Sequence, residues 1–253
     1  MELIKMRPEQ VREAVKSQLP LFLPIGSYEY HGEHLPLGAD TLIAEGICRR
    51  IAEKTNAIVA PPLYFTPTMS WAAGVEDGEM DFSPDALYAY VKEYLAKLMQ
   101  IGFRKIYAMI GHQGKAGLPA ITVQRAFLDA NRDRAHTFGS GWGGLRQEQA
   151  SDMVDDNFFS IVSLCDYDEF VDYAAAGRDE RMPVGHGGRG ETQLIMALYS
   201  GEGLAKTENL ETTGFHIPDW LRDVNQASEE DGEFWVELCA EAWAKKINGD
   251  NKR

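Results

Sequence analysis

Four side chains that can bind metal, the carboxylates of Glu29 and Asp40 and the imidazoles of His31 and His34, lie within one short segment of the chain. Glu29 and His31 are separated by a single residue, and alternate residues of an extended chain point to the same side. His34 and Asp40 follow before the next expected helix. The apolar run 21–25 predicts a buried strand that brings this segment to its carboxyl end, where open α/β sheets bind ligands. The pattern therefore indicates a divalent metal held at the end of a strand.

Short apolar runs alternate with helical patterns along the chain, and local signals such as Ser83 followed by Pro84 are typical of helix starts. The expected strands are 21–25, 57–60, 105–110 and 158–164, and the expected helices are 41–54, 84–100, 116–131, a stretch from 166, 191–199 and 226–248. This order predicts an α/β fold with a mostly parallel central sheet and helices on both faces, in one domain over residues 1–253. The polar region 131–156 interrupts the order and could be a surface excursion, a lid or an oligomer contact.

Composition narrows the possible partners. Of the 253 residues, 44% are hydrophobic and 25% charged, as in ordinary globular domains, and the formal net charge is −14. That balance argues against binding to nucleic acids and to anionic membranes, since both need clustered Lys and Arg. No stretch approaches the roughly 18 apolar residues of a membrane span, and the N-terminus lacks a signal-peptide core. The three widely separated cysteines predict reduced thiols in a cytoplasmic protein.

Two further segments carry histidines to places where they could meet the first segment. The apolar run 106–110 comes just before His112, which is therefore expected at the same sheet edge as Glu29. The glycine-rich stretch from His186 to Glu191 leads into a helix, and glycine lets the backbone approach a site closely. The three segments are thus expected to share one rim.

Each of these residues also has a purely structural interpretation. Asp40 could cap the following helix, and Glu191 could interact with the dipole of its own helix. His112 could be a core histidine bonded to a carbonyl. His34 is expected to support a ligand through a hydrogen bond rather than to bind metal itself.

Charge favours the metal interpretation when the carboxylates are taken together. Three carboxylates gathered in one pocket repel one another strongly unless a cation lies among them. Glu29, Asp40 and Glu191 would be balanced by two divalent ions and one bridging hydroxide. Asp40 is the natural bridge in such a centre, and neutral imidazoles of His31 and His112 would complete the ligand set.

One glycine motif is rejected as a nucleotide site. Residues 139–144 fit the pattern G-x-G-x-x-G, but that motif needs a buried strand before it, and the preceding residues are polar. A flexible loop carrying Trp142 is the better interpretation. Together with Trp71, Tyr28 and Gln113, Trp142 is expected to line the substrate pocket or to support it.

The three segments resemble those of the creatininase (creatinine amidohydrolase) family. Residues 26–40 match a family motif of the form G-S-x-E-x-H-G-x-H-L-P-x-x-x-D, and residues 186–192 match H-x-G-x-x-E-T. Residues 111–115 match a G-H-x-x-N-like loop only in part, because Gln113 and Lys115 replace the residues common there. The resemblance runs from about residue 19 to residue 201 in the same order.

The resemblance implies a three-layer α/β/α sandwich, a binuclear zinc or manganese centre and a homo-oligomer. It implies five metal ligands: Glu29, His31, Asp40, His112 and Glu191. Creatininase itself has a glutamate where this chain has Gly114, and members that lack it use the glutamate matched by Glu191. By the same match, His186 is the expected catalytic histidine.

These observations favour a metal-dependent amidohydrolase that cleaves a non-peptide C–N bond in a small, creatinine-like amide. Within the family, a deformylase or a small-peptide hydrolase is the alternative. The altered loop at Gln113 favours a different alternative, a non-catalytic protein that binds metal or a small molecule on the same fold. A single-metal enzyme is a third, and metal content would separate these hypotheses.

Overall fold

The computed structural model describes residues 1–137, 139–140, 162–177, 181–182, 185–208 and 223–250. The helical elements in these ranges are η1 (Leu3–Lys5), α1 (Pro8–Lys16), α2 (Ala39–Thr55), η2 (Val75–Asp77), α3 (Pro84–Ile101), α4 (Leu118–His136), α6 (Arg189–Leu198), η6 (Val224–Gln226) and α8 (Glu229–Asp250). None of the described helices has both the length and the apolar character needed to cross a membrane.

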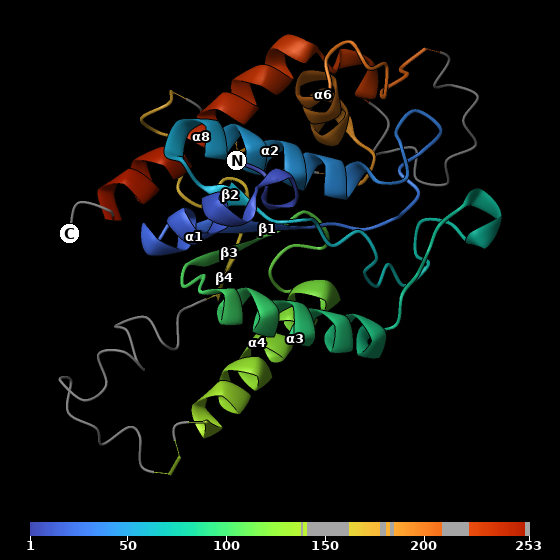
Figure 1. The fold of residues 1–253 in the computed structure, drawn as a ribbon. Helices are drawn as coiled ribbons and strands as arrows, with labels where there is room; N and C mark the ends of the chain where they lie inside the picture. Colours follow the sequence, from blue (N-terminus) through green and yellow to red (C-terminus); the bar gives the residue numbers. More distant parts are fainter. Residues whose placement is uncertain (138, 141–161, 178–180, 183–184, 209–222, 251–253) are drawn as a thin grey trace.

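Four parallel strands form the centre of the molecule (Figure 1). Their order across the sheet is β2 (Ile58–Val59), β1 (Leu21–Ile25), β3 (Ile106–Ile110) and β4 (Val162–Cys165). The register pairs Leu21 with Ile58 on one side of β1 and with Ile106 on the other. Because every strand runs in the same direction, their carboxyl ends meet at one edge of the sheet.

Alternate strand residues face two different helical layers. In β1, Leu21, Leu23 and Ile25 belong to one core with α3 and α4, whereas Phe22 belongs to a second core with α2, α6 and α8. Figure 1 shows these two groups of helices on opposite faces of the sheet. Trp243 of α8 is fully buried against Phe22, edge-on with ring centroids 5.4 Å apart. Successive strand residues thus alternate between two buried faces of the sheet, which confirms the expected three-layer α/β/α architecture.

The chain changes direction across the sheet at β1. It passes from β1 to β2 on one side and then returns to β3 on the other, and such a switch point is where open α/β sheets bind ligands. At this point the N–H of Gly111 donates to the carbonyl of Ile25 at 2.7 Å. A Cβ on Gly26 would lie 2.2 Å from the backbone nitrogen of Thr41, so glycine lets the end of β1 pass close to the start of α2.

Some elements differ from the sequence-based expectation. Helix α1 was not expected, and α4 continues to His136 instead of ending near residue 131. The helix expected from Asp166 is wrong, since described residues 166–177 form turns. There the carbonyl of Tyr167 accepts a hydrogen bond from the indole of Trp243, which competes with a helical ladder.

Two expected features lie partly outside the described residues. Of the strand expected at 158–164, the structure describes β4 from Val162 onward. Of the loop 139–144, it describes only Gly139 and Ser140.

Candidate metal centre

The loop after β1 folds back on itself and places Glu29 beside the start of α2. The N–H of Glu29 donates to the carbonyl of Leu37 at 2.8 Å. Asp40 is the second residue of α2, and Gly38 occupies the N-cap position, so the capping interpretation of Asp40 is wrong. Its side chain instead turns inward, where Oδ2 accepts a 2.6 Å hydrogen bond from the hydroxyl of Ser27.

Asp40 lies between two histidines that come from different strand ends. Its Oδ1 is 3.2 Å from Nε2 of His31, and its Oδ2 is 2.8 Å from Nδ1 of His112. Glu29 reaches the same point, with Oε2 3.2 Å from Nδ1 of His112. All four side chains are buried, so the sheet edge does bring together these residues from the segments after β1 and β3.

Each of three imidazoles contacts a backbone carbonyl through one ring nitrogen. The pairs are His31 Nδ1 with Glu29 O at 2.9 Å, His112 Nε2 with Pro67 O at 3.2 Å, and His186 Nε2 with Tyr30 O at 2.5 Å. Because a carbonyl only accepts, that nitrogen carries the proton, which assigns the tautomer of each neutral ring. The other nitrogen of each ring faces the carboxylates and can offer its lone pair to a metal or a proton.

The glycine-rich segment closes the site from the other side. Glu191 lies in the first turn of α6 and accepts a 2.7 Å hydrogen bond from the N–H of Gly187, while the same oxygen is 3.7 Å from Nε2 of His31. Glu191 therefore lies at a helix start, as its structural interpretation required, and also belongs to the cluster of candidate ligands. Nε2 of His34 lies 2.9 Å from the carbonyl of Gly187 and 3.1 Å from the hydroxyl of Thr192. His34 thus ties the two loops together without facing the carboxylates.

Three overlapping groups in the described ranges have ligand atoms close enough to hold a metal ion, within 4.8 Å of one another. They are Glu29 with Asp40 and His112, His31 with Asp40 and Glu191, and Glu29 with His31 and His186. Asp40 is common to the first two groups and turns a different oxygen toward the histidine of each. Oε2 of Glu29 is buried and has no hydrogen-bond partner among the described residues, which suits an atom that binds a cation.

Burial and neighbouring charges together set the pKa values of these side chains. It raises the pKa of Glu29 to about 8 and that of Glu191 to about 7. Burial opposes charge on His31 as well, but the neighbouring Asp40 and Glu191 raise its pKa to about 10. His186 differs, since burial and the nearby His31 lower its pKa to about 4. Near pH 7, protons are therefore shared among Glu29, Glu191 and His31, whereas the pKa of Asp40 is, despite burial, lowered by the adjacent histidines and His186 stays neutral.

A cavity of about 320 Å³ opens onto the cluster. Trp71 and Gln113 are among its lining residues, and the Trp71 ring stands edge-on to His186 with centroids 5.5 Å apart. Tyr28 is not among the described lining residues, because its ring packs against Phe65 at 6.1 Å. Trp142 lies outside the described residues.

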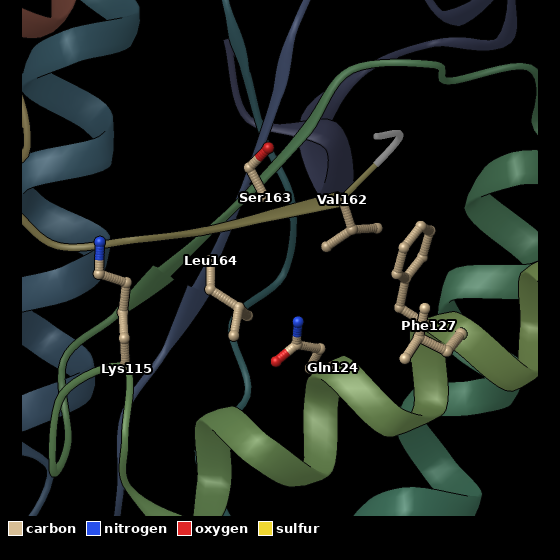
Figure 2. A pocket seen from close by; sticks show the side chains of 7 residues that line it. Lys115, Gln124, Phe127, Val162, Ser163 and Leu164 are labelled. Atoms are coloured by element: carbon tan, nitrogen blue, oxygen red, sulfur yellow. The ribbon is translucent and has the colours of Figure 1, made fainter. Parts of the chain in front are cut away.

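Figure 2 shows a second hollow, of about 410 Å³, between α4 and β4. Its described lining combines apolar side chains with Gln124 and Lys115, and it contains no carboxylate or histidine. Lys115 is paired with Glu169 at 2.5 Å. Among the described residues, the candidate metal ligands therefore lie at the strand ends and not in this hollow.

Sequence reasoning did not identify Ser27, Thr68 or Glu79. Glu79 is only 2% exposed and accepts hydrogen bonds from the Tyr30 N–H at 3.2 Å and the Thr68 hydroxyl at 2.6 Å. The only signal in the sequence was the acidic character of residues 76–81, which equally well describes an exposed loop.

Comparison with known proteins identifies the family to which the chain belongs. The chain is 26% identical to the creatinine amidohydrolase of Pseudomonas putida over 251 aligned positions, which cover 90% of this chain and 88% of the relative. It is 29% identical to the mycofactocin precursor peptide peptidase of Mycobacterium tuberculosis over 146 positions, which cover 53% of this chain and 55% of the relative.

Solved structures share the fold. A manganese form of creatininase and the Zn–Zn form of a creatininase mutant match with TM-scores of 0.74 and 0.73, each at 21% identity. Both alignments cover all of this chain and 98–99% of the other. The family model described as creatinine amidohydrolase matches residues 5–247, and the chain therefore belongs to the creatininase family.

Proposed function

We propose that this protein is a hydrolase that uses two divalent metal ions to cleave a C–N bond in a small amide. The observation that carries the proposal is Asp40, whose two oxygens face His31 and His112 in two separate candidate metal groups. A carboxylate shared in this way is suited to bridge two ions.

The donor set fits such a centre. Glu29, Asp40 and His112 would hold one ion, and His31, Asp40 and Glu191 the other. Oxygen and imidazole donors without thiolate suit Zn, Mn and similar ions. The manganese and Zn–Zn forms of the creatininase structures support the same choice of metals.

Bound divalent ions would supply a Lewis acid and a water whose pKa is lowered to near neutrality. His186 would move the proton that hydrolysis requires. Its Nε2–H is held by the Tyr30 carbonyl, and its Nδ1 faces the cluster, 3.7 Å from Oε2 of Glu29. Because the pKa of His186 is lowered to about 4, the ring is neutral near pH 7, so Nδ1 can accept a proton and pass it to the leaving nitrogen.

The size of the cavity supports a small substrate. A volume of about 320 Å³ suits a small ring better than an extended polymer, and the similarity to the creatinine amidohydrolase of Pseudomonas putida supports a cyclic amide. The similarity to a peptide peptidase supports the second candidate, a short peptide. Met69 and Trp71, which are 60% and 53% exposed at the rim, could contact the part of such a peptide that lies outside the cavity.

The first experiment is metal stoichiometry by elemental analysis on protein purified without chelator, compared with Glu191→Ala. We expect about two ions per chain and a lower value in the variant. One ion per chain would favour a single-metal enzyme. No uptake of added Zn or Mn would overturn the hydrolase proposal and favour the non-catalytic binding protein. Cyclic amides, N-formyl compounds and short peptides then separate the substrate classes.

A further inference from the structure

The peptide group that holds His31 is itself held by a carboxylate. The carbonyl of Glu29 accepts from Nδ1 of His31 at 2.9 Å. The N–H of the same peptide belongs to Tyr30 and donates to Oε2 of Glu79 at 3.2 Å. A continuous path therefore runs from the Glu79 carboxylate through one amide to the imidazole.

His112 has a matching arrangement built from a different segment. The carbonyl of Pro67 contacts Nε2 of His112 at 3.2 Å, and the N–H of that peptide belongs to Thr68 and donates to Oδ1 of Asp81 at 2.8 Å. Two candidate ligand histidines are thus each held by an amide whose N–H is bonded to an acid of residues 79–81.

We propose that Glu79 and Asp81 are positioning residues that strengthen metal binding through these two amides. The inference rests on the proposed metal-dependent function. A charged acceptor on the N–H polarises the amide and makes its carbonyl a stronger acceptor for the imidazole N–H. The imidazole is then fixed in one orientation and tautomer, and its opposite nitrogen becomes a stronger donor to a metal.

Burial makes the two paths unequal. Glu79 is 2% exposed, and its second oxygen accepts from the hydroxyl of Thr68 at 2.6 Å, so both of its oxygens are engaged. Asp81 is an exposed residue, and water screens its charge. The Glu79 path to His31 should therefore contribute more to metal affinity than the Asp81 path to His112.

Asp81 also contacts the turn that follows Pro67. Met69 and Ser70 have φ values of 64° and 45°, a left-handed conformation that side chains other than glycine adopt only at a cost. Asp81 also accepts from the Met69 N–H at 3.1 Å, and the Ser70 N–H donates to the Thr68 hydroxyl at 3.2 Å. These contacts hold the turn in the shape that aims the Pro67 carbonyl at His112.

The test is the affinity of the whole protein for Zn²⁺ and Mn²⁺, measured by competition with a chelator. Loss of such supporting hydrogen bonds typically costs about 10- to 100-fold in metal affinity. We expect about a tenfold or greater loss for Glu79→Gln and a smaller loss for Asp81→Asn. Glu79→Asp keeps the charge of the acceptor and should therefore retain more affinity than Glu79→Gln. Glu76→Gln, an exposed residue of the same segment, should leave the affinity unchanged.

The outcomes separate this inference from the proposed function. A wild-type protein that takes up no metal would contradict the metal-dependent function itself. If the wild type takes up metal normally and both Glu79→Gln and Asp81→Asn bind it with wild-type affinity, the role of the two acids would be overturned. Wild-type affinity in Glu79→Asp, combined with a loss in Glu79→Gln, would support the proposal, because the charge of the acceptor is what polarises the amide. Should Glu79→Gln fail to fold, the exposed Asp81→Asn variant still decides between an affinity loss and none.

Discussion

Oδ2 of Asp40 lies 2.8 Å from Nδ1 of His112, although the two residues belong to different layers of the molecule. Asp40 is carried by the first turn of α2, and His112 follows the carboxyl end of β3. The opposite oxygen of Asp40 faces His31 at 3.2 Å. One carboxylate therefore connects a helix start with two strand ends, and the geometry of the whole cluster depends on it.

Replacing Asp40 should affect both metal positions together. In Asp40→Asn the side chain keeps its shape but loses its charge, so we expect metal content to fall from about two ions per chain to fewer than one. Ser27→Ala removes only the 2.6 Å hydrogen bond to Oδ2 and should weaken binding without abolishing it. Elemental analysis of both variants checks the prediction. Loss of a single ion in Asp40→Asn would contradict the bridging role.

His186 should separate metal binding from turnover. We expect His186→Ala to retain about two ions per chain and to lose activity by roughly 10²- to 10⁴-fold, as for removal of a general acid or base. His34→Ala is the control for removing a nearby imidazole that does not face the carboxylates, because His34 contacts Gly187 and Thr192 instead. Metal content and turnover are measured on the same preparations. If His186→Ala lost metal instead, His186 would be a ligand, as its place beside Glu29 and His31 allows.

Metal uptake should release protons and should strengthen as pH rises. In the metal-free protein the pKa of Glu29 is raised to about 8 and that of His31 to about 10, so both groups hold protons at pH 7. A metal must displace these protons, and each one displaced changes the affinity by about tenfold per pH unit below its pKa. Affinity should therefore fall as pH is lowered from 8 to 6.

The measurement is titration calorimetry in buffers of different ionisation enthalpy at a fixed pH. The apparent enthalpy should vary with the buffer in proportion to the number of protons released. Glu29→Gln removes one of these protons and should reduce the dependence. A heat that is the same in all buffers would show that the site is already deprotonated before metal arrives.

Gly232 should be necessary for the packing of α8 on α6. A Cβ at this position would lie 1.9 Å from the carbonyl oxygen of Gln193 and 2.9 Å from the Cβ of Ala197. Gly232→Ala should therefore lower the free energy of unfolding by about 1–3 kcal/mol, the usual cost of overpacking. Gly249, in the same helix, has nothing within 4 Å of its Cβ position. Because Gly249 is the next-to-last residue of the helix, where intrinsic propensity counts little, Gly249→Ala should leave the free energy of unfolding nearly unchanged. Urea unfolding of the two variants therefore separates a clear loss of stability from none.

The periodicity of the chain determines much of the fold. Residues 21–25 and 106–110 are short apolar runs that lie between helical patterns, and alternation along them follows from local stereochemistry. Because parallel strands share one edge, Glu29 and His112 could be expected at the same place before their distance was known. Local sequence signals gave the wrong prediction where a distant side chain bonds to the backbone. At Tyr167, for example, the carbonyl accepts a hydrogen bond from the indole of Trp243.

The sequence alone indicated candidate metal ligands and a carboxylate that two metal ions could share. Glu29, His31 and Asp40 are close along the chain, and gathered carboxylates need a cation among them. Only the tertiary structure decided which carbonyl each histidine uses. Pro67 and Glu79 are far from His112 and His31 in the sequence, and a backbone carbonyl or a buried acid has no distinctive local pattern. Their positions depend on how the segment 64–82 folds against the strand ends, where burial makes every polar atom find a partner.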